Sequence, residues 1–447
     1  MNTNNHRQKR ATTRSNELQT AGLLVFCTSA VLGTAAPVGA QLADSAWPDY
    51  GGGYANQHCS PNRGPAGDPT VLWTFDLQGI GAQGFQKGFH QPILLPDGTI
   101  VLNTADSSDD QIVALNPDGT FRWRFDESSL GPWLAADQND QIYTIRHTYG
   151  MSSSARLRAV NFEGGAVWTT SLPGSNPTQN GPAVGRDGNV YAAVDFSALQ
   201  AISSSGAVDW SYASAGYYDN PAVADDGTIY IGGDGLKALA PDGRLLWSYP
   251  VRTEYGHNPR YLSPAIGDDG TVFAGQTSTV SNLVALDNAT GKAIWTRPDL
   301  DGTPAIGPDG TVYVVPESGL LHALDPADGA TLWTYLTGKT DYYNSEGVTI
   351  DVGGNLYISN DQGLVTALSP EGQLRWSLDL APEISGFVGL SAPVIGPNET
   401  LYIVGGNTGK VFAIAPEPST LALLGVGASG LAAFGWRRRR KHRRSQT

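Results

Sequence analysis

Short apolar runs recur along this chain and are separated by tight turns rich in Asp and Gly. One stretch reads "PAIG", "TVYVV", "LLHALD" and "TLWTY", which indicates four consecutive short strands. Asp-Gly between the first two strands supplies the positive φ that a tight antiparallel hairpin needs, and a Gly between the last two does the same. The pattern therefore predicts small antiparallel sheets of four strands, without long amphipathic helices.

This four-strand pattern repeats along most of the chain. Its last two strands carry the skeleton seen in "ALDNATGKAIW" (285–295), and the leading Ala recurs eight times at spacings of 37 to 47 residues. That spacing is typical of the blades of a β-propeller. The Trp that begins each last strand is expected to pack between neighbouring blades, rather than to form eight chemical sites. These predicted docking residues are Trp73, Trp123, Trp168, Trp210, Trp247, Trp295, Trp333 and Trp376.

The two ends of the repeat region complement one another. A strand resembling the fourth strand of a repeat, residues 71–75, precedes the first repeat, and the last repeat ends before its own fourth strand. We therefore predict an all-β, single eight-bladed β-propeller over residues 71–415, with four antiparallel strands per blade. The N-terminal strand would join the last blade and close the ring. Seven blades is the alternative, because the repeats that start at Pro132 and Val348 are degenerate.

The chain begins with a basic segment followed by an apolar run, and Val38-Gly39-Ala40 resembles a cleavage site. We interpret residues 1–40 as a signal peptide, with a retained membrane anchor as the alternative, and residues 41–70 as a lead-in. Without both basic ends, 17 Lys and Arg stand against 41 Asp and Glu, a formal net charge of −24. Such a core repels nucleic acid, so no nucleic-acid partner is predicted. Cys59 is then the only cysteine, which leaves no internal disulfide.

The repeats resemble those of the pyrroloquinoline-quinone-like β-propeller superfamily, over residues 47–415. "ALDNATGKAIW" is similar to its tryptophan-docking repeat, and "WPDYGGGYANQHCSP" (47–61) resembles its N-terminal lead-in. The superfamily includes quinoprotein dehydrogenases and an outer-membrane assembly lipoprotein. Its alcohol dehydrogenases hold the quinone under a ring of adjacent cysteines, beside a calcium ion bound by Glu, Asn and Asp. This chain has no adjacent cysteines, so no cofactor is predicted, and pyrroloquinoline quinone or calcium is left open.

The C-terminal residues 416–447 resemble the PEP-CTERM sorting signal. Pro416, Glu417 and Pro418 form the motif, residues 421–436 are apolar, and residues 437–444 are basic. The resemblance implies a sorting transpeptidase of the exosortase type as a partner, with transient membrane association through this segment. It also implies an exported protein at the cell surface, in the outer envelope or in the extracellular matrix of a bacterium. An ordinary tail anchor is the alternative.

The loops between blades vary in length and are rich in aromatic and polar residues, whereas the turns on the opposite face are short. Aromatic faces next to polar groups suit sugar rings, and ordinary solvated loops are the alternative. His90, His147 and His257 lie on the same face, but no ligand spacing supports a metal site. The predicted binding residues are Tyr217, Tyr218, Asp219, Tyr255, His257, Arg260, Tyr342, Tyr343 and Asn344.

No catalytic motif emerges from the sequence, so we favour an exported, non-enzymatic binding or scaffold module at the cell surface. Extracellular polysaccharide is one candidate ligand. The first alternative is a quinone- or metal-dependent enzyme on the same propeller. The second is an envelope-assembly scaffold that binds other proteins, which an exposed apolar strip on the rims of the blades would favour.

Overall fold

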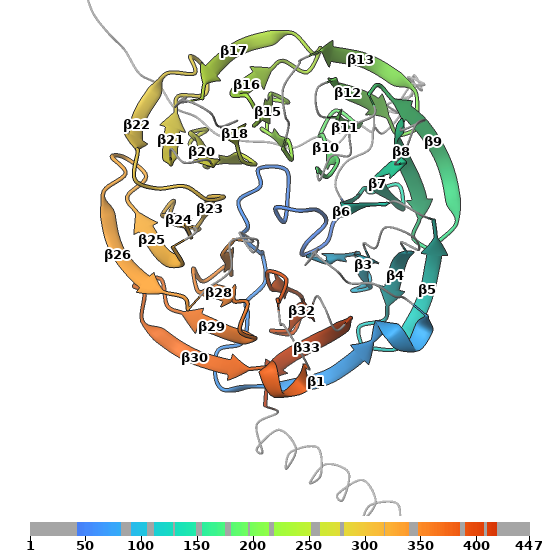
Figure 1. Ribbon diagram of the computed structural model, residues 1–447, viewed down its shortest axis with the longest axis vertical. Helices are drawn as coiled ribbons and strands as arrows, with labels where there is room; N and C mark the ends of the chain where they lie inside the picture. The colour runs from blue at the N-terminus through green and yellow to red at the C-terminus, as the bar shows by residue number, and fades with distance from the viewer. Residues whose placement is uncertain are drawn as a thin grey trace, which may run out of the picture. The chain divides into compact units, whose positions relative to one another are not determined.

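The computed structural model describes residues 43–81, 91–104, 111–127, 130–148, 154–174, 180–194, 197–213, 219–251, 260–277, 281–316, 318–338, 347–384, 389–405 and 409–417. These residues form eight antiparallel sheets that follow one another around a ring. In each sheet the innermost strand is next to the central axis and the outermost strand lies on the rim (Figure 1). The prediction of an all-β, eight-bladed propeller is confirmed.

The first four sheets follow the chain order without interruption. Their strands are β2 (Ile93–Leu94), β3 (Ile100–Thr104), β4 (Gln111–Leu115) and β5 (Phe121–Asp126); β6 (Leu130–Ala136), β7 (Gln141–Thr148), β8 (Ser154–Asn161) and β9 (Ala166–Leu172); β10 (Ala183–Val184), β11 (Asn189–Val194), β12 (Ala198–Ser203) and β13 (Val208–Ala213); and β14 (Ala222–Val223), β15 (Ile229–Ile231), β16 (Gly235–Leu239) and β17 (Leu245–Pro250).

The next three sheets continue the series, and the fifth carries one additional short strand, β18 (Arg260–Tyr261), paired with β20. The remaining strands of these sheets are β19 (Ala265–Ile266), β20 (Val272–Thr277), β21 (Asn282–Leu286) and β22 (Ala293–Arg297); β23 (Ala305–Ile306), β24 (Val312–Val314), β25 (Leu320–Leu324) and β26 (Thr331–Leu336); and β27 (Thr349–Ile350), β28 (Leu356–Ser359), β29 (Leu364–Leu368) and β30 (Leu374–Asp379).

The eighth sheet joins the two ends of the described chain. It consists of β31 (Val394–Ile395), β32 (Leu401–Gly405), β33 (Lys410–Pro416) and, outermost, β1 (Pro69–Asp76). The pairing of β1 with β33 is antiparallel and runs from Pro69 opposite Pro416 to Asp76 opposite Lys410. The predicted closure of the ring by the N-terminal strand is therefore confirmed, and this pairing removes two free sheet edges.

The core is divided into clusters that lie between neighbouring sheets. In one of them Phe273, Leu283 and Trp295 of the fifth sheet pack with Ile306 and Val312 of the sixth. The inner strands are buried on both faces, whereas the outermost strands alternate between exposed and partly buried residues. Two short 3-10 helices, η1 (Leu77–Ile80) and η2 (Ala381–Glu383), follow β1 and β30. Within the described ranges, no helix has the length and apolar character needed to cross a membrane.

Candidate functional site

Each repeat Trp lies between its own sheet and the next one around the ring. Trp295 stacks at 5.9 Å from Phe273 of its own sheet, and its Nε1 donates to the carbonyl of Pro326 in the following sheet at 2.7 Å. Gly329 of that turn has a φ of +71°, and a Cβ there would lie 2.8 Å from the indole. The turn therefore accepts the large ring only because it carries Gly. The other seven indoles also donate to a carbonyl in a turn or loop outside their own sheet.

The lead-in occupies the middle of the ring, which sequence reasoning did not foresee. Figure 1 shows it as the dark blue segment that crosses the centre before it turns outward to β1. Its backbone carbonyls accept hydrogen bonds from the inner strands of six sheets, with N–O distances of 2.7 to 2.9 Å. The donors are Leu94, Ala136, Val223, Ile266, Ile306 and Ile350, and the acceptors are Trp47, Pro48, Tyr54, Ala55, Gln57 and His58.

The two other sheets also contact the lead-in. Tyr54 packs against the cluster that contains Val184 of β10, and Ser60 Oγ donates to the carbonyl of Ile395 in β31 at 3.2 Å. All eight sheets therefore contact the lead-in, and we call its central part, residues 43–60, the hub. The lead-in reaches these contacts through residues with positive φ: Gly52, Gly53, Asn56 and His58.

Two ionisable residues of the lead-in are buried at the hub. Asp49 is 4% exposed and His58 is 2% exposed. Burial raises the pKa of the Asp49 carboxyl to about 7, although the backbone amides of Gly51, Gly52 and Gly53 oppose the shift. Burial lowers the pKa of His58 to about 4. Asp49 Oδ1 and both His58 ring nitrogens have no hydrogen-bond partner among the described residues.

A hollow of about 520 Å³ opens between the lead-in and the turns that follow β14 and β19. Four carboxylates line it, and each is engaged by a protein group: Asp225 by Arg186, Asp226 by Thr228, Asp268 by Gln57 and Asp269 by Thr271. Arg186 also lies over the ring of Tyr54 at 4.4 Å. These contacts explain the acidic lining as part of the packing between the hub and the blades.

The ligands that the enzyme interpretation requires do not come together in the described part of the chain. No group of three or more His, Cys, Asp or Glu side chains there is placed to hold a metal ion. Cys59 has no disulfide partner. Burial first, and then the charges of Asp351 and Asp268, raise the pKa of its thiol to about 11, so it is protonated at neutral pH. These residues do not fit the quinone and calcium site that the resemblance implies.

Most of the predicted binding residues lie outside the described ranges: Tyr217, Tyr218, Tyr255, His257, Tyr342, Tyr343 and Asn344. The same holds for His90, and nothing is described of the side chain of His147. Asp219 is described, and its carboxylate accepts hydrogen bonds from the Asn220 amide at 2.8 Å and from Ser263 Oγ at 2.7 Å. Arg260 begins β18 of the fifth sheet, whereas Asp219 lies in the loop that precedes β14 of the fourth sheet. The polysaccharide hypothesis stays a prediction.

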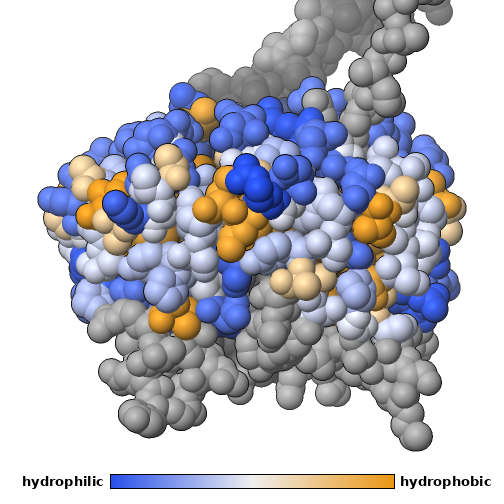
Figure 2. All heavy atoms as spheres, turned by 90° about the horizontal axis from the view of Figure 1, so that it is seen from above, coloured by the Kyte–Doolittle hydropathy of each residue, from blue (hydrophilic) through white to orange (hydrophobic). Residues whose placement is uncertain are grey.

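The rim of the ring carries exposed apolar side chains, the feature expected to favour an envelope-assembly scaffold. Every outermost strand exposes at least one large apolar side chain, with exposed fractions from 41% to 69%. We call this set the apolar rim; it consists of Leu72, Phe121, Val167, Val208, Leu245, Leu246, Ile294, Leu332, Leu336 and Leu374. Figure 2 shows several hydrophobic patches along the side of the ring, separated by more hydrophilic residues.

A β-bulge in each outermost strand lies at or next to the exposed apolar residues, apart from Leu336, which lies beyond the bulge of β26. In all eight sheets the register shifts at the residue just before the docking Trp, for example at Leu332 before Trp333 and at Arg122 before Trp123. An extra residue at that point breaks the simple alternation of faces. Either the bulged residue or its predecessor is therefore apolar and turned to solvent.

Comparison with known proteins supports both resemblances. A family model described as "Outer membrane protein assembly factor BamB" matches residues 153–298 and 232–422, and one described as "PEP-CTERM protein-sorting motif" matches residues 415–440. The outer membrane protein assembly factor BamB of Yersinia pestis is 28% identical over 318 residues, which cover 65% of this chain and 76% of the relative. The sorting motif indicates export and sorting within the cell envelope.

Solved structures share the propeller fold at low sequence identity. BamB from Moraxella catarrhalis aligns with a TM-score of 0.58 and 19% identity, over 78% of this chain and 98% of that one. A quinohemoprotein alcohol dehydrogenase from Comamonas testosteroni gives 0.63 and 15%, over 82% and 80%. A europium-containing methanol dehydrogenase gives 0.64 and 12%, over 83% and 98%. With its repeats matched across more than half its length, the chain belongs to the family of propellers described as outer membrane protein assembly factor BamB.

Proposed function

We propose that this protein is a non-enzymatic scaffold of the cell envelope that binds other proteins through the apolar rim. The observation that carries the proposal is the exposed apolar side chain on the outermost strand of every sheet. Separate apolar residues on a surface are ordinary, but a set that recurs at one structural position all around the ring is not. Contact with protein partners would remove these side chains from water.

The hub supports the same assignment. The lead-in fills the position on the axis where a propeller could hold a small ligand, and it ties all eight inner strands together. In the described part of the chain, the apolar rim is a surface whose side chains the packing of the blades leaves exposed. The Yersinia pestis relative is named as an assembly factor, which is a role of this kind. The outer membrane itself is not part of the proposal.

Site-specific photo-crosslinking in the native host tests this function. A photoreactive residue at Leu332 or Leu374, both more than half exposed on the rim, should give discrete adducts with one or a few envelope proteins. The same residue at Asp328, in an exposed turn after β25, is the control and should give none. If the rim positions give no protein adduct while the purified protein binds the host's extracellular polysaccharide, the scaffold proposal is wrong.

A further inference from the structure

The sorting motif begins inside the propeller rather than after a linker. Pro416 is the last residue of β33, and it pairs with Pro69 at the beginning of β1. β33 lies between β32 and β1, and its pairing with β1 is the seam at which the two ends of the described chain close the ring. Pro416 and Glu417 are therefore presented by a folded sheet; Pro418 lies outside the described residues.

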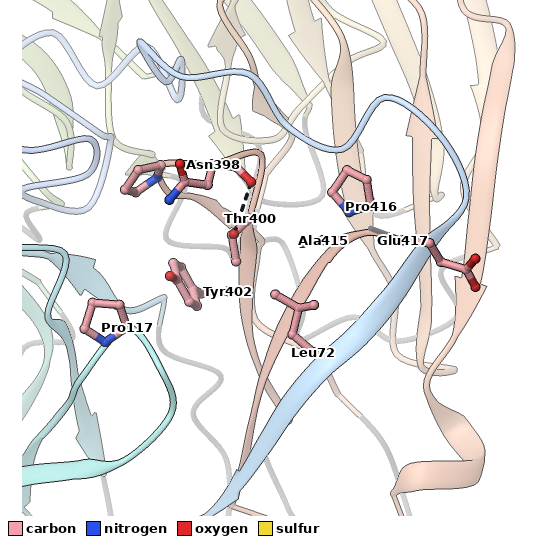
Figure 3. A pocket seen from close by; sticks show the side chains of 9 residues that line it. Leu72, Pro117, Asn398, Thr400, Tyr402, Ala415, Pro416 and Glu417 are labelled. Atoms are coloured by element: carbon pink, nitrogen blue, oxygen red, sulfur yellow. Dashed lines mark hydrogen bonds between the residues drawn. The ribbon is translucent and has the colours of Figure 1, made fainter. Parts of the chain in front are cut away.

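A second hollow of about 520 Å³ adjoins this point. Figure 3 shows Leu72 and Tyr402 pointing into it, Asn398 and Thr400 above them, and Pro416 with Glu417 along one side. Leu72 is 49% exposed. In the seven other sheets a turn connects the third strand to the fourth, but here β33 continues into the sorting motif. Within the described ranges no such turn covers this seam hollow, and its accessible apolar side chain is Leu72, since Tyr402 is only 4% exposed.

The sequence brings the membrane-directed segment close to the seam hollow. The apolar run starts at Leu421, four residues after Glu417. Even a fully extended chain of that length spans at most about 14 Å. An enzyme that binds both the motif and the apolar run must therefore approach the ring to within that distance of Glu417.

We propose that the seam hollow is part of the docking surface for the sorting enzyme, and that it receives an apolar side chain of that enzyme. Pro416 and Glu417 belong both to the motif and to the lining of the hollow, so an enzyme that binds the motif also reaches the hollow. The seam hollow offers an apolar floor with polar groups at its edge, which suits an apolar residue flanked by hydrogen-bonding groups. This surface is separate from the contacts proposed for the rest of the apolar rim.

A matched pair of substitutions tests the proposal. Leu72 and Val352 are large apolar residues of similar exposure, 49% and 47%, and Val352 lies in the turn after β27, outside the apolar rim. Intact-mass spectrometry after a pulse of synthesis in the native host measures how fast the tail is removed. We expect Leu72→Glu to slow removal by about threefold or more, because a charge on the floor of the hollow would be buried on docking. Val352→Glu, at a position outside the apolar rim, should be processed at the wild-type rate.

A variant with a linker distinguishes an effect of Leu72→Glu on docking of the enzyme from an effect on folding of the propeller. Insertion of about twelve Gly and Ser residues between Ala415 and Pro416 releases the motif from the ring. In that background Leu72→Glu should have no further effect on tail removal. Thermal unfolding confirms that each variant is folded, and Leu72→Ser replaces Leu72→Glu if the charged variant is not. The proposal is overturned if the Leu72 variant is processed like wild type, or if it is slowed equally with the linker present.

Discussion

Seven sheets are built from consecutive strands of the chain, whereas the eighth combines its last three strands with its first one. Each of the seven is contiguous in sequence, and a turn joins its last two strands. The eighth combines β33 with β1, and it has no such turn to receive the indole of the seventh sheet. Trp376 Nε1 instead donates to Pro65 of the lead-in at 2.9 Å, and Arg375 Nη2 donates to Ala66. The repeats thus build the blades, whereas residues 43–76, which are outside the repeats, complete both the hub and the seam.

Removal of the segment outside the repeats should have the largest effect. We expect a chain that lacks residues 41–76 to lose cooperative unfolding, because β33 is left as a bare edge and eight inner strands lose their partner at the hub. Size-exclusion chromatography and urea unfolding followed by tryptophan fluorescence measure this. A folded monomer of normal size would show that the repeats suffice.

Loss of one docking Trp should have the next largest effect. Trp295→Ala is expected to lower the free energy of unfolding by about 3–5 kcal/mol, since it removes a nearly buried indole and leaves a cavity. Trp333→Ala and Trp376→Ala should have similar effects. Denaturant unfolding measures all three. A much smaller loss at Trp376 alone would show that the lead-in replaces the missing turn only loosely, and losses under about 1 kcal/mol at all three would reject inter-blade docking.

The pH dependence of stability should arise at the hub. The folded-state pKa of Asp49, about 7, exceeds the ordinary value of 3.8, so its contribution to stability falls as pH rises from about 4 to 7. The folded-state pKa of His58, about 4, is below 6.5, so its contribution rises as pH rises from about 4 to 6.5. The two slopes oppose each other in the wild-type protein.

Single substitutions should separate these slopes. In Asp49→Asn the His58 slope remains, so the free energy of unfolding should increase by up to about 3 kcal/mol between pH 4 and 6.5. In His58→Gln the Asp49 slope remains, and the free energy should decrease over the same range. Urea unfolding at a series of pH values measures both. Parallel curves for the two variants would mean that the hub does not control the pH response.

Substitution on the rim should have the smallest effect on stability. Leu246→Ser removes an exposed side chain next to Trp247, so the free energy of unfolding should change by no more than about 0.5 kcal/mol. The same change should reduce the yield of protein adducts from a nearby photoreactive position. A large loss of stability would mean that the apolar rim serves packing rather than binding.

The repeats allowed the blades to be predicted because their signals are local. The closing strand, predicted at 71–75, spans Pro69–Asp76, since its pattern matches the other outermost strands. The role of the lead-in could not be predicted, because its hydrogen bonds to the inner strands join positions separated by 47 to 335 residues. The apolar rim could not be predicted from the sequence for another reason. Phe121 and Trp123 have the same parity in their strand, yet the bulge between them leaves Phe121 exposed and Trp123 partly buried.

The eight bulges also limit how this protein can associate. A regular outer strand offers a continuous row of amides and carbonyls on which a foreign strand can add itself, and chains crowded in an envelope would then polymerise edge to edge. An interruption before each docking Trp twists that row out of line. Partners must then be recognised by side chains rather than by backbone pairing, so complexes can form and separate without any exchange of strands.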